Sequence, residues 1–131
     1  MSKTLEVYFP GGKRIDAKIE DFVVHTDQSL ANGGEESAPE PLQIFLASIA
    51  TCAGIYALEF CQAREITSEG MALTMSCEWD EKQQGIKKLH IDLKVPPGFP
   101  DRYKKAVARV MDLCSVKKHI IHPPEFIITV N

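Results

Sequence analysis

Four cysteines are the residues of this chain best suited to redox chemistry, and two of them have surroundings that favour it. Cys52 lies in a long apolar segment beside small residues such as Gly54, and Cys114 ends a second segment with helical spacing. A thiol that attacks a peroxide, together with a distant thiol that resolves the sulfenic acid, would need this arrangement. The alternative is that both cysteines are buried and pack as small hydrophobic side chains.

The other two cysteines are expected to be structural. Cys61 shares an expected helix with Cys52, and their spacing places the two on opposite sides. Cys77 alternates with Met75 and Trp79 on one face of an expected strand, where small buried side chains are common. With no signal peptide in the sequence, the four thiols indicate a reducing cytoplasm, where cysteines are more often catalytic or redox-sensing than disulfide-bonded.

Cys52 needs a lowered pKa to act as a nucleophile, because a cysteine with the ordinary pKa of about 8.5 is only a few per cent ionised near pH 7. In the middle of a helix it is too far from the N-terminus to use the helix dipole. We therefore expect a cation from another segment, and a guanidinium suits this role because it stays charged when partly buried. The candidates are Arg14, Arg64, Arg102 and Arg109. Arg14 is preferred because it follows a hairpin turn and could reach over the helix.

Metal and cofactor chemistry is not expected. His119 and His122 follow Cys114 closely, but neither an H-E-x-x-H motif nor a pair of C-x-x-C motifs is present. These histidines more simply occupy a helix C-terminus, where such side chains are favourable. Gly33-Gly34 is not followed by lysine and serine or threonine in the order of a phosphate loop.

Composition fits one globular domain over residues 1–131, since 44% of the residues are hydrophobic and 25% are charged. The net charge of −3 argues against nucleic-acid binding, and the basic run Lys117-Lys118-His119 is too small for it. The uncharged stretch 41–58 contains polar residues and only approaches the length of a membrane span, so we expect a buried helix and no membrane. A helix that is apolar nearly all round needs more cover than this chain supplies, which predicts a homodimer.

Hydrophobic periodicity predicts an α+β fold in which antiparallel hairpins surround two long helices. The stretch 26–41 has no apolar period and is expected to form a loop over a site. The expected strands span residues 4–9, 15–19, 22–25, 71–80, 89–95 and 126–130. The expected helices span residues 41–64 and about 101–114, with a short helical turn at 117–121.

Two motifs give the chain a family resemblance. The first runs from Pro39-Glu40-Pro41-Leu42 through Phe45-Leu46-Ala47-Ser48-Ile49-Ala50-Thr51-Cys52, and the second is Asp112-Leu113-Cys114-Ser115-Val116-Lys117-Lys118. With the order of elements, these motifs resemble the OsmC/Ohr family over essentially the whole chain. The resemblance implies an OsmC-like fold and an intertwined homodimer with two interface sites, each holding a reactive and a resolving cysteine.

The resemblance also implies an activity, because the best-known members of this family reduce organic hydroperoxides. Cys52 would form a sulfenic acid, Cys114 would resolve it as an intramolecular disulfide, and an external dithiol would reduce that disulfide. Arg14 would hold the thiolate. An apolar substrate pocket would be lined by Phe45, Ile49, Tyr56 and Leu58, which would explain a preference for alkyl hydroperoxides.

One position departs from the hydroperoxide-resistance branch of the family. Leu42 stands where that branch has a glutamate that holds the arginine, and Glu40 is the nearest carboxylate in the chain. The alternative function is therefore a peroxidase-inactive dimer that binds apolar ligands or senses redox state.

Overall fold

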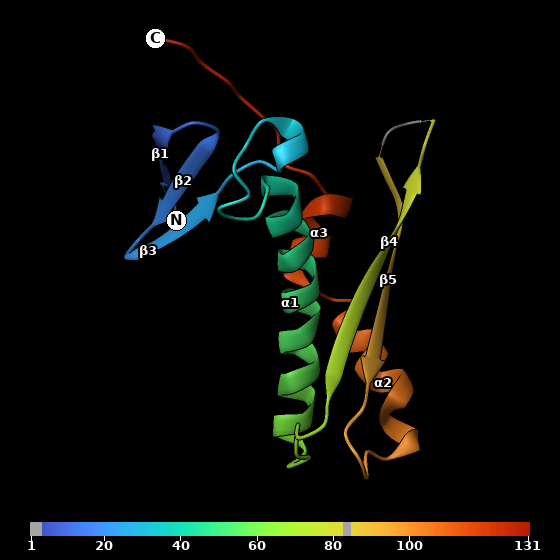
Figure 1. Cartoon of the computed structure of the whole chain (residues 1–131). Coiled ribbons are helices and arrows are strands. Elements are labelled where there is room, and N and C mark those ends of the chain that lie inside the picture. Colours follow the sequence, from blue (N-terminus) through green and yellow to red (C-terminus); the bar gives the residue numbers. More distant parts are fainter. Residues whose placement is uncertain (1–3, 83–84) are drawn as a thin grey trace. The chain divides into compact units, whose positions relative to one another are not determined.

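The computed structural model describes residues 4–82 and 85–131. The chain forms two compact units, Met1–Ala47 and Ser48–Asn131, here called the N-terminal and C-terminal units. Helix α1 (Pro41–Ala63) begins in the first unit and continues into the second (Figure 1). The assignment of residues 1–131 to a single domain stays a prediction.

The N-terminal unit contains a three-stranded antiparallel sheet. Its strands β1 (Glu6–Gly11), β2 (Arg14–Ile19) and β3 (Phe22–Thr26) lie in the order β1-β2-β3, as hairpin alternation predicts. Gly12 occupies the first turn with a φ of +59°, a conformation that glycine adopts without steric cost. The predicted first hairpin and third strand are confirmed.

Residues 27–40 form a loop around the fully buried carboxylate of Asp27. This carboxylate accepts hydrogen bonds from the backbone N–H groups of Gln28 and Ser37 and from the Ser37 hydroxyl. The loop contains a short 3-10 helix, η1 (Leu30–Asn32). Gly34 lies so close to the backbone of Gln28 that a Cβ would stand 2.1 Å from its carbonyl oxygen. Buried hydrogen bonds, rather than apolar packing, therefore hold this loop.

The C-terminal unit combines most of α1 with a second hairpin and short helices (Figure 1). Strands β4 (Ala72–Asp80) and β5 (Gly85–Lys94) form a two-stranded antiparallel sheet in which Cys77 pairs with Leu89. A 3-10 turn, η2 (Asp101–Tyr103), leads into α2 (Lys104–Met111) and then α3 (Ser115–Ile121). The core is formed by Ala57, Phe60, Cys61, Phe99 and Val107.

Helix α1 begins at Pro41, the favoured first-turn position, as the sequence predicts. By length and composition it is apolar enough to cross a membrane, a property that core helices of soluble proteins share. Its buried residues, Ile49, Ala53, Ala57, Phe60 and Cys61, follow a single face.

Two expectations were wrong. The second helix is not long, because the chain leaves helical geometry between α2 and α3, and Cys114 takes φ −46° and ψ 128° as the N-cap of α3. Residues 126–130 do not form a strand in the single chain. A strand needs a neighbour for its backbone hydrogen bonds, and these residues pair with none of the described strands, which leaves Ile128 86% exposed.

Candidate active site

The structure brings Cys52 and Cys114 together within the C-terminal unit. The Ser115 Oγ lies 3.6 Å from the Cys52 Sγ on α1, and Cys114 is close enough for its thiol to contribute to the lowered pKa of Cys52. The non-helical break before α3 creates this arrangement, because it directs Cys114 and the first turn of α3 toward α1. Cys52 is half-buried and Ser115 is exposed, so the sulfur remains accessible to a small molecule.

Hydrogen bonds favour the thiolate of Cys52. Burial raises the pKa of this thiol, but hydrogen bonds from the Cys114 thiol, the Val116 N–H, and the hydroxyl and N–H of Ser115 outweigh burial and lower the pKa overall. The N–H groups of Ser115 and Val116 are available because the first turn of a helix has no internal acceptors for them. These donors belong to the same unit as Cys52.

Sequence reasoning missed these donors. Because Cys52 is too far from the N-terminus of its own helix to use the dipole of that helix, the sequence predicts a cation from another segment. The segment Cys114-Ser115-Val116 could have indicated them. A serine directly after the second cysteine brings a hydroxyl and backbone N–H groups close to any residue that this cysteine approaches.

Cys114 has the opposite character. It is buried, and burial together with its hydrogen bond to Cys52 raises its pKa. Cys61 is fully buried in the core, where burial also raises its pKa. Cys77 is partly buried on β4. The two thiols of the site therefore differ, since the pKa of Cys52 is lowered and that of Cys114 is raised.

A large cavity borders Cys114 in the C-terminal unit. Its volume is about 1090 Å³, and its apolar wall combines residues of α1, β5, α2 and α3. Ile49 lines this cavity, Tyr56 is half-buried on α1 outside its lining, and Phe45 lies at the start of α1 in the N-terminal unit. The apolar lining includes Ile49, Ala53, Leu89, Ile91, Val107, Met111 and Ile120, and the charged lining includes Lys94, Lys105, Arg109 and Asp112.

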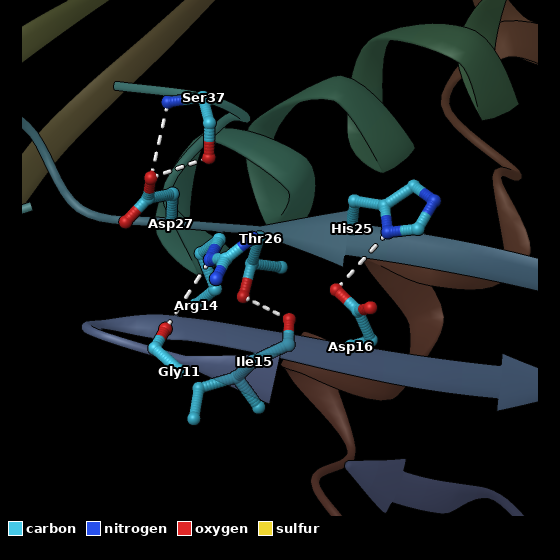
Figure 2. Close-up of polar contacts among 8 residues, drawn as sticks. All are labelled: Gly11, Arg14, Ile15, Asp16, His25, Thr26, Asp27 and Ser37. Carbon is cyan, nitrogen blue, oxygen red and sulfur yellow. Dashed lines mark hydrogen bonds and ion pairs between the residues drawn. The ribbon is translucent and has the colours of Figure 1, made fainter. Parts of the chain in front are cut away.

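Arg14 belongs to the N-terminal unit, where its Nε donates to the Gly11 carbonyl oxygen at 3.2 Å (Figure 2). It borders a cavity of about 230 Å³ together with Asp16 and His25, whose Oδ1 and Nδ1 atoms lie 3.0 Å apart. Glu40 is not its partner in the described part of the chain. The Glu40 Oε1 instead accepts from the Ser29 N–H at 3.0 Å, which ties the loop to the start of α1.

The remaining charged candidates have local contacts. The Arg64 Nη1 donates to the Phe60 carbonyl oxygen at 3.1 Å, and its guanidinium lies over the Phe60 ring, so it caps the end of α1. Lys117 pairs with Asp112. The His119 Nδ1 donates to the Ser115 carbonyl oxygen. Within the described residues, no group of three or more histidine, cysteine or acidic side chains is placed to hold a metal.

The sequence matches the family described as OsmC-like protein over residues 33–129. The chain belongs to this family. Its fold agrees with that of solved structures at low sequence identity. For a Psychrobacter arcticus protein named for osmotic stress induction and a detoxification response, the TM-score is 0.78 at 22% identity, covering 94% of this chain and 90% of that one.

Two further OsmC-like structures show the same fold. An OsmC like protein from Mycoplasma pneumoniae gives a TM-score of 0.69 at 16% identity, covering 94% of this chain and 89% of that one. An organic hydroperoxide resistance protein OsmC from Legionella pneumophila gives 0.59 at 19% identity, covering 92% and 89%. A comparison with curated proteins finds no match.

Proposed function

We propose that this OsmC-like protein is a thiol-dependent peroxidase that reduces organic hydroperoxides through Cys52, with Cys114 as the resolving thiol. One observation carries the proposal: the break at Cys114 brings the start of α3 to Cys52, with the Ser115 Oγ 3.6 Å from the Cys52 Sγ. The lowered pKa of Cys52 and the raised pKa of Cys114 agree with it. The apolar cavity beside Cys114 supports an organic rather than an inorganic peroxide. The name of the Legionella pneumophila protein also supports it.

The reaction needs only the two thiols and an external reductant. The Cys52 thiolate attacks the terminal oxygen of the hydroperoxide, the O–O bond breaks, and Cys52 becomes a sulfenic acid. The alkoxide leaves as the alcohol after taking a proton from water. The Cys114 sulfur then attacks the sulfenic sulfur, a disulfide forms, and the hydroxyl leaves with the Cys114 proton as water. An external dithiol reduces the disulfide. The proposed protein is cytoplasmic, and its reaction uses no bound cofactor, no metal and no membrane.

Arg14 is the proposed additional cation for the Cys52 thiolate, on the ground of its place after the first hairpin turn and the family resemblance. Ile49 is the proposed centre of the substrate pocket because it lines the cavity that Cys114 borders. Phe45 and Tyr56 lie on the same helix and are proposed to extend this pocket. Because Leu42 cannot form an ion pair, the arginine would be held differently here than in the hydroperoxide-resistance branch.

A homodimer is part of the proposal. Helix α1 buries one face only, and Ile55 on another face is 45% exposed. A Cβ built at Gly54 would meet no atom within 4 Å, so this side of the helix is open in the single chain. The segment 126–130 exposes Phe126, Ile127, Ile128 and Val130. A second copy that covers these apolar surfaces would remove a large area of them from water.

The test is consumption of cumene hydroperoxide and of hydrogen peroxide by the purified protein with dihydrolipoamide as reductant. Wild type is compared with Cys52→Ser, Cys114→Ser and, as a matched control, Cys77→Ser. We expect turnover that prefers the organic peroxide, is lost in Cys52→Ser and is kept in Cys77→Ser. Absence of turnover in wild type, or turnover that survives Cys52→Ser, would overturn the proposal.

The cavity of about 1090 Å³ favours a second candidate, a dimer that binds apolar ligands without turnover. Under this function, a fluorescent apolar probe binds wild type and Cys52→Ser equally, and neither protein consumes peroxide. Binding that is equal in the two proteins together with turnover in wild type alone would favour the peroxidase.

A further inference from the structure

We propose that the Ser115 hydroxyl is a catalytic group of this site, which holds the Cys52 sulfur in its attacking form by donating a hydrogen bond to it. The inference rests on the proposed function only in taking Cys52 as the reacting thiol. In this proposal a neutral hydroxyl helps to stabilise the Cys52 thiolate, a role for which the sequence predicts a guanidinium.

The geometry places a hydroxyl beside the sulfur. The Ser115 Oγ lies 3.6 Å from the Cys52 Sγ, within hydrogen-bonding range for sulfur. A thiolate has no proton, so in the reactive form of the site the hydroxyl must donate and the sulfur must accept. The bond joins α1 to the first residue of α3, because Ser115 directly follows the break at Cys114.

Ser115 has a role that Cys114 cannot fill throughout the reaction. The Cys114 thiol also contributes to the lowered pKa of Cys52, but a thiol is a weak donor, and Cys114 must give up its proton when it attacks the sulfenic sulfur. The Ser115 hydroxyl takes part in no bond that forms or breaks, so it can donate to the Cys52 sulfur also at the stages at which Cys114 has no proton to donate.

The contact also makes the site less dependent on an arginine clamp. Leu42 cannot hold an arginine by an ion pair, and Glu40 is engaged with Ser29. The Ser115 hydroxyl is one of the groups that together lower the pKa of Cys52 against the effect of burial. A hydroxyl that stabilises a charge by hydrogen bonding needs no buried counter-ion of its own.

The experiment measures the rate at which iodoacetamide alkylates Cys52 as a function of pH in reduced full-length protein. Fragment mass spectrometry assigns the modification to Cys52 and separates it from the other cysteines. The variants are Ser115→Ala and the nearly isosteric pair Ser115→Thr and Ser115→Val, of which only threonine keeps a hydroxyl. Ser76→Ala, an exposed serine on β4, is the matched control. Circular dichroism verifies that each variant is folded.

We expect Ser115→Ala and Ser115→Val to lower the alkylation rate of Cys52 at pH 7 about tenfold, with the loss recovered at high pH, because a hydrogen bond to a charged group contributes about this much. Ser115→Thr and Ser76→Ala should keep the wild-type profile. An unchanged profile in Ser115→Ala, or equal profiles in the threonine and valine variants, would overturn the inference. Because alkylation needs no peroxide, a shifted profile without peroxide turnover would instead overturn the proposed function alone.

Discussion

The Ser115 Oγ lies 3.6 Å from the Cys52 Sγ, and Cys114, the residue before Ser115, lies close enough to Cys52 for the two thiols to shift each other's pKa. The two shifts have opposite directions, although the two side chains are chemically identical. The pKa of the half-buried Cys52 is lowered, whereas that of the buried Cys114 is raised. Under the proposed function, this difference favours Cys52 as the attacking thiol and Cys114 as the resolving thiol.

The first prediction concerns the order of thiol modification. With iodoacetamide at neutral pH, Cys52 should be alkylated well before Cys114, because the pKa of Cys52 is lowered and that of Cys114 is raised. Cys61 should stay unmodified in folded protein, since it is fully buried. Fragment mass spectrometry over a time course measures the order. Modification of Cys114 before Cys52 would contradict the assigned roles.

The second prediction concerns the oxidation state after peroxide treatment. Without a reductant, wild type should lose two hydrogens as Cys52 and Cys114 form a disulfide. In Cys114→Ser the sulfenic acid has no resolving thiol, so Cys52 should gain one oxygen and then a second or third as peroxide continues to react. Intact-protein mass spectrometry separates these products. Formation of a disulfide within the Cys114→Ser chain would show that another cysteine resolves Cys52.

Local sequence patterns were sufficient to predict those parts of the fold that depend on interactions between residues close together in the chain. Alternating side chains predict the hairpins, and Pro41 marks the first turn of α1, as the structure confirms. The break before Cys114 was missed because Val110 and Cys114 keep helical spacing across it and no glycine or proline lies between them. The exposed apolar segment 126–130 shows a different limit, since alternation indicates a strand only where a partner strand exists.

The candidate site divides in the same way. Residue type and surroundings were enough to single out Cys52 and Cys114, which the structure brings together. The donors to Cys52 were not predicted, because Ser115 and Val116 reach it only after the chain has folded back through β4, β5 and α2. Local sequence patterns describe the surroundings of Cys52 within α1, whereas the donors to its sulfur come from the first turn of α3.

The third prediction tests the proposed role of Arg14. If its guanidinium helps to hold the Cys52 thiolate, Arg14→Gln should lower the rate of reaction with an organic hydroperoxide at pH 7, with less effect at high pH where the thiol ionises without help. The adjacent Lys13→Gln removes the same charge from the same turn and serves as control. Stopped-flow single-turnover rates give the comparison. Equal rates in the two variants would remove Arg14 from the site.

The fourth prediction tests the homodimer. Light scattering of wild type should give twice the chain mass of 14.6 kDa. Ile55→Asp introduces a charge on the exposed apolar side of α1 and should shift the protein toward the monomer, because burying an unpaired carboxylate at an interface is costly. Ser68→Asp, in an exposed position beyond α1, should leave the mass unchanged. A monomeric wild type would contradict the proposal.

The last prediction concerns the pH dependence of stability through Asp27. Hydrogen bonds from Ser37 and from the backbone of Gln28 lower the pKa of this buried carboxyl from 3.8 to about 2. A carboxyl whose pKa is lower in the folded state stabilises that state above its unfolded pKa and loses this contribution as the pH falls through the folded value. Asp27→Asn should therefore be less stable than wild type at pH 7, and the difference should shrink between about pH 4 and pH 2.

Urea unfolding midpoints at pH 7, 4, 3 and 2 measure this difference. Asp21→Asn, at an exposed position two residues after β2, is the control for removing one negative charge. Because the midpoint of wild type itself changes with pH, the test is the difference in midpoint between Asp27→Asn and wild type at each pH. The corresponding difference for Asp21→Asn should stay small at every pH. A midpoint difference between Asp27→Asn and wild type that is as large at pH 2 as at pH 7 would contradict the prediction. It would mean that the amide destabilises the protein by its shape or hydrogen bonding, and that the charge of Asp27 does not hold the loop.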